Sequence, residues 1–281
     1  MRKSTKIWLI IASSLVVIGC AIFGGVMTMI KWDFTKLSTV KYETNDYKIN
    51  ENYENISIVT DTADIVFEYS KDAKTSVVCY EENKIKHSVA VSDNTLIIEV
   101  EDARKWYEHI GIHFGTPKIT VSIPQGEYGT LSVKTSTGNI RVGNVSADTL
   151  DFSVSTGNVT VSDVICKGNI KIKVSTGKTS IMGAKCQNFM TNGSTGKVSL
   201  KNVIATEKFS IERSTGDIKF DGCDAANIFI KTNTGDVKGK LLTDKVVVAQ
   251  TDTGSVDVPK TVNGGRCEIS TNTGDIKIEI K

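Results

Sequence analysis

The chain has 281 residues, a formal net charge of +2 at pH 7 and 40% hydrophobic residues. This is enough chain for one large domain or two small ones. Lysines and acidic residues are interspersed through the second half and form no continuous basic stripe of the kind that follows a phosphate backbone. We therefore expect no nucleic-acid partner.

The N-terminus carries a predicted membrane anchor. A basic segment, residues 1–6, precedes an uncharged and mostly apolar run, residues 7–30, which is long enough to cross a bilayer as a helix. Because positive charge is concentrated before the run, we expect residues 1–6 in the cytoplasm and the rest of the chain outside the cell. Residues 31–54 are expected to be a juxtamembrane linker.

A cleaved lipoprotein signal is the alternative to this anchor. Val17-Ile18-Gly19-Cys20 fits a lipobox, so Cys20 is a candidate lipidation site. The segment after Cys20 stays apolar, whereas a mature lipoprotein usually turns polar there. We favour the uncleaved anchor, and both alternatives place the following domain on the outer face of a membrane.

Residues 55–130 read as an irregular β capping region. Ile56 to Phe67 has the pattern of one solenoid coil, with Ala63 where the later coils have glycine. Strand-like runs follow at residues 75–80, 95–100 and 118–123, separated by turn signals. A solenoid needs such a cap to cover its first open edge.

Residues 131–281 contain a regular repeat. Thr-Gly occurs eight times at intervals of 19 or 20 residues, and each time a Ser, Asn or Asp precedes it. A fixed period of this length is typical of a stacked solenoid. A tight corner often requires a positive φ, which favours glycine, and we expect the preceding polar side chains to bond the corner amides. The predicted corner glycines are Gly138, Gly157, Gly177, Gly196, Gly216, Gly235, Gly254 and Gly274.

The apolar residues around each glycine give the fold class. They fall seven and five residues before it and two and four after it, which predicts two short strands per coil. A further small apolar residue, seven after the glycine, is expected to plug the core: Val145, Val164, Ala184, Val203, Cys223 and Leu242. We predict an all-β, parallel, right-handed β-solenoid whose final strand, residues 275–281, closes the C-terminal end.

Two cysteines are predicted to be neighbours. Cys166 and Cys186 each lie nine residues after their glycines in successive coils, so stacking brings them to about one strand spacing, within disulfide range. A disulfide between them is possible outside the cell.

These features together resemble a family. A basic start with one apolar span, a Trp-Asp-Phe segment after it, a strand ending in Val121, Ile123 and Pro124, and Thr-Gly-Asp/Asn-Ile coils are similar to the bacterial "putative adhesin" domains of unknown function, which include LiaG-like cell-envelope proteins. The resemblance implies a parallel β-solenoid outside a bacterial cell, with a link to envelope stress. It implies no catalytic residues.

The residues themselves favour no catalytic, cofactor or metal site. Asp217, Asp236 and Asp275 follow their glycines, but lysines and Asn139 or Asn158 interrupt the series, which is typical of a solvated surface. One segment before the coils gathers aromatic and basic residues and is a candidate binding loop, with a covering insertion as the alternative. Its two histidines lack a third zinc ligand. The loop comprises Arg104, Trp106, Tyr107, His109, His113 and Phe114.

The sequence therefore predicts a non-enzymatic, membrane-anchored, extracellular binding or adhesin-like module of the cell envelope, with a glycan or protein partner. A scaffold in an envelope-stress signalling system and a glycan-active enzyme are the alternatives. Its oligomeric state is left open.

Overall fold

The computed structural model describes residues 3–37, 40–71, 73–106 and 115–281. These residues divide into two compact units, Met1–Tyr42 with Arg104–Gly115, and Glu43–Ala103 with Thr116–Lys281. In the first unit the chain forms helix α1 (Lys3–Met29) and the 3₁₀ helix η1 (Phe34–Leu37). Helix α1 exposes many large apolar side chains and is long and apolar enough to cross a membrane.

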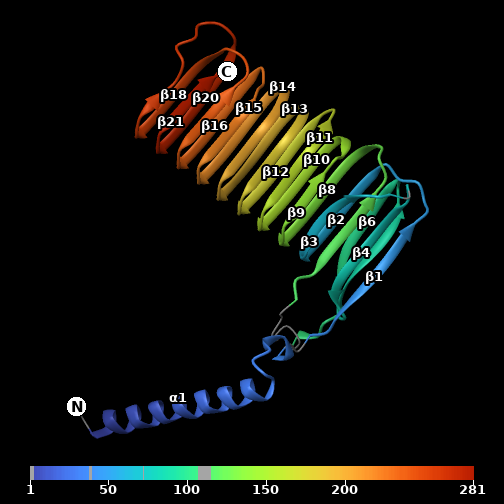
Figure 1. Ribbon diagram of the computed structural model, residues 1–281, viewed down its shortest axis with the longest axis vertical. Helices are drawn as coiled ribbons and strands as arrows, with labels where there is room; N and C mark the ends of the chain where they lie inside the picture. The colour runs from blue at the N-terminus through green and yellow to red at the C-terminus, as the bar shows by residue number, and fades with distance from the viewer. Residues whose placement is uncertain (1–2, 38–39, 72, 107–114) are drawn as a thin grey trace. The chain divides into compact units, whose positions relative to one another are not determined.

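The second unit is a rod of stacked β-strands (Figure 1). Strand β1 (Tyr42–Ile49) falls within residues 31–54, the range expected to be a linker. The strands are β1 (Tyr42–Ile49), β2 (Asn55–Thr62), β3 (Asp64–Tyr69), β4 (Thr75–Glu82), β5 (Ile85–Ser92), β6 (Thr95–Asp102), β7 (Lys118–Ile123), β8 (Glu127–Thr137), β9 (Ile140–Gly143), β10 (Ser146–Thr156), β11 (Val159–Cys166), β12 (Asn169–Thr176), β13 (Thr179–Thr195), β14 (Val198–Thr215), β15 (Ile218–Cys223), β16 (Asn227–Thr234), β17 (Val237–Leu241), β18 (Lys245–Thr253), β19 (Val256–Asp257), β20 (Gly265–Thr273) and β21 (Ile276–Ile280).

The rod is a parallel β-solenoid of about eight turns, which confirms the predicted fold class. The right-handed coil stays a prediction. Strand segments before the corner glycines pair with one another in parallel, as in Leu150↔Ile170, and segments after them do the same, as in Val159↔Thr179. We call these two sets the pre-corner row and the post-corner row. Each coil therefore contributes one strand segment to each row.

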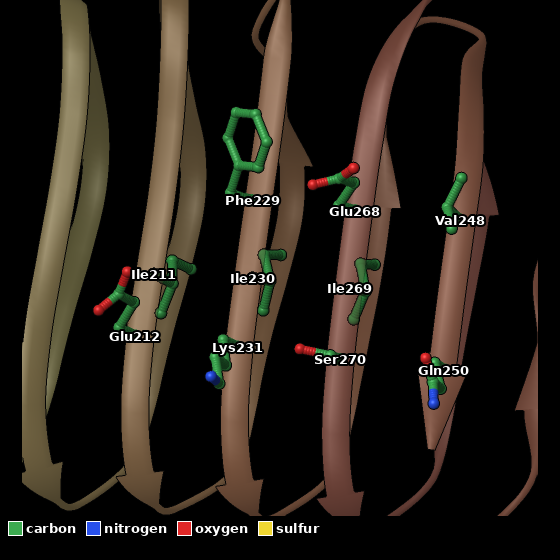
Figure 2. Close-up of a pocket in the computed structure, with 10 residues that line it drawn as sticks. All are labelled: Ile211, Glu212, Phe229, Ile230, Lys231, Val248, Gln250, Glu268, Ile269 and Ser270. Atoms are coloured by element: carbon green, nitrogen blue, oxygen red, sulfur yellow. The ribbon is translucent and has the colours of Figure 1, made fainter. Parts of the chain in front are cut away.

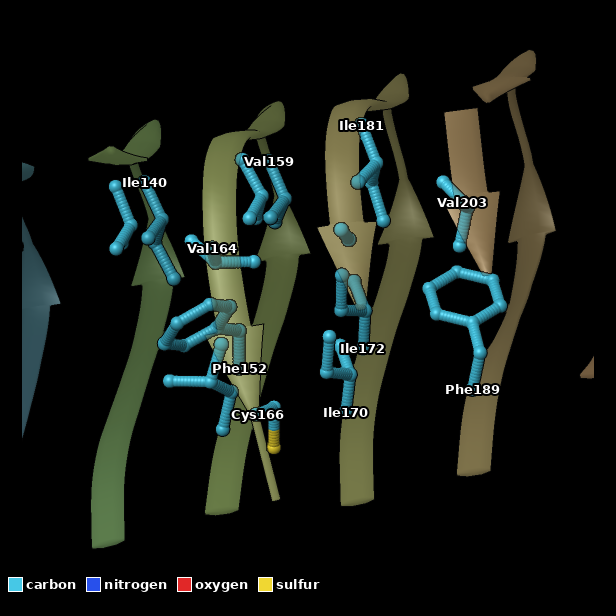
Figure 3. Close-up of a cluster of buried hydrophobic side chains, with 14 of the residues drawn as sticks. Ile140, Phe152, Val159, Val164, Cys166, Ile170, Ile172, Ile181, Phe189 and Val203 are labelled. Atoms are coloured by element: carbon cyan, nitrogen blue, oxygen red, sulfur yellow. The ribbon is translucent and has the colours of Figure 1, made fainter. Parts of the chain in front are cut away.

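The core lies between the two rows. Figure 3 shows the alternate apolar side chains of successive coils pointing into it, among them Phe152, Ile172 and Phe189. Phe152 and Phe189 are fully buried, and Phe189 packs on Phe209 with ring centroids 5.1 Å apart. Because each coil buries its apolar face against its neighbours, the stack rather than the single repeat is the stable unit.

The corner glycines have two physical reasons to be glycine. Their φ angles lie between 135° and 146°, where residues with a side chain are strained. In addition, a Cβ at Gly157 would lie 1.9 Å from the carbonyl oxygen of Gly138 in the preceding coil, and at the other corners the distance is 1.8–2.3 Å. Ala63 stands at the end of this stack, next to Gly138, and is not among the residues with positive φ. Alanine is therefore tolerated there.

A second corner follows six residues after most of the glycines. Asn144, Asp163, Gly183, Asn202 and Gly222 all have left-handed φ angles, between 51° and 70°. Asn, Asp and Gly adopt this conformation at the lowest cost. This corner turns the chain back toward the next pre-corner strand.

The predicted core plugs are buried except one. Leu242 is 38% exposed, whereas its neighbour Leu241 is fully buried and pairs with Cys223. The pairing shifts register between Asp221 and Cys223, and the coil of Gly235 has Leu241 where the five preceding coils have a left-handed Asn, Asp or Gly. The prediction for Leu242 is therefore wrong by one residue.

The N-terminal end of the rod departs from chain order. The coil of β2 and β3 lies between β8 and β9 on one side and β6 and β7 on the other. Beyond that outermost coil the sheets continue with antiparallel strands, because β4 pairs with β7 and β5 pairs with β6. Strand β1 then pairs with β4. These strands cover the end of the rod.

The C-terminal end is also out of chain order, which corrects the expected closure. Strand β20 pairs with both β16 and β18, and β21 pairs with both β17 and β19 (Figure 1). The last coil, formed by β20 and β21, therefore lies between the coil of β16 and β17 and the coil of β18 and β19. We call it the inserted coil. Strands β18 and β19 form the edge of the rod. Pro259, which lacks an N–H group, follows β19 at this edge, where such a residue is tolerated.

Candidate functional site

The candidate loop around Trp106 is only partly described. Trp106 exposes 81% of its surface, and Arg104 is half-buried. The grouping of these residues into a binding loop stays a prediction. Four of its members lie outside the described residues: Tyr107, His109, His113 and Phe114.

The residues that follow the corner glycines form a hydrogen-bonded column, which we call the corner ladder. Asn139 Oδ1 accepts hydrogen bonds from the backbone N–H (3.0 Å) and the Nδ2 (2.9 Å) of Asn158. Asp275 Oδ1 accepts one from the backbone N–H of Ser255 (2.8 Å). Side chains after the glycine, rather than the expected ones before it, thus satisfy backbone amides between coils.

The aspartates of the corner ladder are structural. A hydrogen bond from Lys197 lowers the pKa of Asp217, one from Lys238 lowers the pKa of Asp236, and hydrogen bonds from Ser255 lower the pKa of Asp275. A catalytic acid at neutral pH needs a raised pKa. These carboxylates are therefore poor candidates for general acids.

The structure brings together a buried polar cluster that the sequence did not suggest. Glu81 on β4 and His87 on β5 are almost fully buried, with 2.6 Å between Glu81 Oε2 and His87 Nδ1. Glu81 also accepts hydrogen bonds from the backbone N–H of His87 (2.8 Å) and from Asn45 on β1 (2.6 Å). His87 Nε2 lies 2.8 Å from the hydroxyl of Thr60 on β2. The cluster therefore ties four strands of the N-terminal end together.

The same cluster contains the residues of the described chain best placed to hold a metal ion. Cys79, Glu81 and His87 each offer a donor atom, and these atoms lie within 4.8 Å of one another. Burial, and secondarily the charge of Glu81, raises the pKa of Cys79 to about 12, so its thiol is protonated. The carboxylate and the imidazole already bond to protein groups. These hydrogen bonds account for the arrangement of the side chains as a structural network.

The cysteine pair is in the predicted register. Ile165 pairs with Lys185, which places Cys166 and Cys186 at matching positions of adjacent coils. Both thiols are free and buried, and burial raises the pKa of both, that of Cys186 to about 12. Disulfide formation stays a prediction. It can be tested by unfolding the protein without reducing it and counting the thiols that react.

A shallow groove lies on the outward side of the pre-corner row at the C-terminal end of the rod (Figure 2). Its volume is about 330 Å³, and it crosses β14, β16, β20 and β18. Phe229 and Val248 give it an apolar floor, and Val248 is 57% exposed. We call it the aromatic groove. Polar side chains stand around the floor: Glu212, Lys231, Gln250, Glu268 and Ser270.

The groove presents hydrogen-bonding groups of both polarities. The ammonium group of Lys208 lies 5.5 Å from the centre of the Phe229 ring, a distance at which it is attracted to the ring. Glu268 forms an ion pair with Arg266 of the same strand. An aromatic surface with convergent carboxylate, amide and hydroxyl groups is typical of sites that bind small polar ligands. The sequence did not reveal it, because the last two of the four coils that form it stack in the reverse of chain order.

Comparisons with known proteins agree with the architecture. A protein from Bacteroides fragilis called a "putative adhesin" has a crystal structure similar to this chain, with 20% identity, a TM-score of 0.51, and coverage of 85% of this chain and 97% of that one. A "putative adhesin" from Parabacteroides distasonis is 14% identical, with a TM-score of 0.47 and coverage of 85% and 98%. At 20% identity, the likeness to the Bacteroides fragilis protein shows the fold alone.

The curated proteins include no significant match to the chain. The family model described as Toastrack DUF4097, in contrast, matches residues 53–279, which include strands β2 to β20 and all eight Thr-Gly corners. This span covers most of the chain and the whole of the regular solenoid. The chain therefore belongs to the Toastrack DUF4097 family.

Proposed function

We propose that the chain is a membrane-anchored binding module that presents its β-solenoid on the outer face of a bacterial membrane. Helix α1 has the length and composition of a membrane span, and basic residues precede its apolar run, which favours a cytoplasmic N-terminus. The similar structure from Bacteroides fragilis is called a "putative adhesin". These observations support display of the solenoid outside the cell.

The module acts by binding rather than by catalysis. The carboxylates of the corner ladder bond to backbone amides and lysines, and the Glu81–His87 pair is buried. The outward surface of the last coils instead offers concave, mixed apolar and polar lining. The aromatic groove is the single observation that carries this proposal.

The ligand class that fits the aromatic groove is a carbohydrate of the cell envelope. A sugar ring presents an apolar face that can stack on Phe229 and hydroxyl groups that can bond Glu212, Gln250 and Ser270. The groove is open and crosses four strands, so it admits a segment of a chain as well as a single ring.

Binding of envelope glycans to the full-length protein in detergent tests this proposal. We expect Phe229→Ala to weaken binding about tenfold or more, because truncating an aromatic anchor costs about 1–2 kcal/mol. Met190→Ala is the matched control, since Met190 lies in the same outward column two strands away and outside the groove. Equal affinity of the Phe229→Ala variant and the unaltered protein would contradict the proposal.

A further inference from the structure

A second groove lies on the outward side of the post-corner row. It has a volume of about 500 Å³ and is formed by β14, β15, β17 and β21. Five lysines and two carboxylates line it, which leaves a net charge of +3. We call it the lysine groove. Its charged residues are Lys201, Lys219, Lys238, Lys240, Lys277, Asp221 and Glu279.

Three of these lysines stand in one column. Lys219 pairs in register with Lys238, and Lys238 pairs in register with Lys277. All three are exposed, and parallel pairing sets adjacent backbones about 4.8 Å apart. Like charges in register on adjacent strands are destabilising. The fold therefore accepts a repulsion here that a bound anion would remove.

The available carboxylates neutralise the groove only in part. Glu279 lies 3.2 Å from Lys240 and 3.4 Å from Lys277, so one carboxylate serves two lysines. Lys238 pairs with Asp236 of the corner ladder at 2.8 Å. Within the described residues, no carboxylate is within ion-pair distance of Lys201 or Lys219. Exposed pairs of this kind exchange partners at little cost.

Adjacent lysines occur in this column at the C-terminal end of the rod. Along the same column, the three coils before Lys219 carry the neutral residues Thr160, Ser180 and Ser199, and a single Arg141 precedes them. Beyond Lys277 the column ends at Asp257 on the edge strand β19. The insertion of the last coil creates this arrangement, because stacking in chain order would place Asp257 between Lys238 and Lys277.

We propose that the lysine groove binds a linear polymer carrying phosphate groups, which lies across the coils along the column of Lys219, Lys238 and Lys277. Lysine is a point-charge binder of phosphate. The column spans three coils, so a chain of phosphates can meet all three ammonium groups, whereas a single phosphate reaches two neighbours at most. This inference goes beyond the carbohydrate site and does not depend on it, because the aromatic groove belongs to the other row of strands.

The test uses the full-length protein in nanodiscs of zwitterionic lipid and inorganic polyphosphate as the probe. The groove variant is Lys219→Gln/Lys238→Gln/Lys277→Gln. The matched control, Lys134→Gln/Lys171→Gln/Lys173→Gln, removes the same charge from the outward side of the pre-corner row. Unchanged melting temperatures show that both variants are folded, and Phe229→Ala should bind polyphosphate like the unaltered protein.

We expect the groove variant to bind polyphosphate at least tenfold more weakly. The slope of log affinity against log salt concentration should fall by about two, since each lost contact with a single-stranded polyanion contributes about 0.7. The control variant should change neither quantity. Polyglutamate, which carries the same sign of charge without phosphate, should bind more weakly than polyphosphate.

Four results would overturn the proposal. They are absence of polyphosphate binding by the unaltered protein, equal losses in the two triple variants, equal binding of polyglutamate, and binding to phosphatidylglycerol vesicles without binding to polyphosphate. The last result would assign the lysines to a lipid surface.

Discussion

At its N-terminal end the rod is covered by additional strands. At its C-terminal end the last coil lies between the two coils that precede it in the sequence. Antiparallel β4 and β5 continue both sheets beyond the outermost coil, and β1 lies beyond β4. At the other end β18 and β19 each pair on one side only, with β20 and β21. One end is therefore closed by a separate cap, and the other end remains an edge made of a regular coil.

Each end also contains a buried pair of polar side chains in direct contact, but the two pairs differ in setting. Glu81 and His87 are enclosed by four strands and have side-chain exposures of 0% and 2%. Lys245 at the start of β18 pairs with Asp224 at 2.6 Å, with side-chain exposures of 4% and 12%. The first pair holds the cap to the rod. The second pair joins the edge coil to the residues before β16, on the far side of the inserted coil. Stability at the two ends should thus depend on different residues.

The largest expected effect is at the N-terminal end. Glu81→Ala removes a carboxylate that accepts three hydrogen bonds and leaves His87 buried without its partner. We expect the free energy of unfolding of the cap to fall by about 3–5 kcal/mol, as measured by hydrogen exchange of β4 and β5. Glu99→Ala, which removes an exposed carboxylate from the neighbouring strand β6, is the control and should have little effect. A loss below about 1 kcal/mol for Glu81→Ala would refute the role of the cluster.

A smaller effect is expected at the C-terminal end. Lys245→Met keeps much of the buried side-chain volume but leaves Asp224 without its cation, at a rim where water reaches the carboxylate. We expect a loss of about 1–3 kcal/mol, confined to amides of β18 and β20 because solenoid stability is local. Lys260→Met, an exposed change on the same edge coil, should leave these amides protected. Equal loosening of β4 and β5 would show that the ends are coupled.

How far the sequence predicted these ends depends on what the repeat encodes. The glycine spacing and period-two apolar residues predicted both rows, because the same backbone corner recurs in each coil. The repeat could not predict the order of stacking. Every coil presents the same Thr-Gly frame to its neighbours, so the coils of Gly254 and Gly274 fit either way.

The functional surfaces were less predictable for related reasons. Val77, Cys79 and Glu81 alternate along β4 and all three are buried, so this alternation was the sequence signal for the buried cluster. It was missed because a glutamate in a polar segment is usually exposed. The column of Lys219, Lys238 and Lys277 exists because the last coil stacks against the coil of Gly235, so it could not be predicted by stacking the coils in chain order. The predicted aromatic loop around Trp106 stays a prediction.

The smallest effect separates the two halves of the corner ladder. The C-terminal half depends on Asp217, Asp236 and Asp275, whose pKa values lie below normal, whereas in the other half the corner between Asn139 and Asn158 is held by amide side chains, which do not titrate. Because their pKa values are lower in the folded state, the aspartates stabilise it above pH about 4, and this contribution is lost as the pH falls further. Hydrogen exchange should show the C-terminal corners loosening first on acidification. Equal loosening of both halves would contradict the assignment.

The insertion of the last coil is the central claim of this account, and disulfide trapping tests it most directly. Lys277 pairs in register with both Lys238 and Asp257, whereas Lys238 and Asp257 are separated by a strand. These positions are exposed, so mild oxidation reaches them before the buried native thiols. We predict disulfides in the Lys238→Cys/Lys277→Cys and Asp257→Cys/Lys277→Cys variants and none in Lys238→Cys/Asp257→Cys, where two strand spacings exceed disulfide range. Efficient cross-linking of the Lys238→Cys/Asp257→Cys variant, with none in Lys238→Cys/Lys277→Cys, would show that the coils stack in chain order and would contradict the claim.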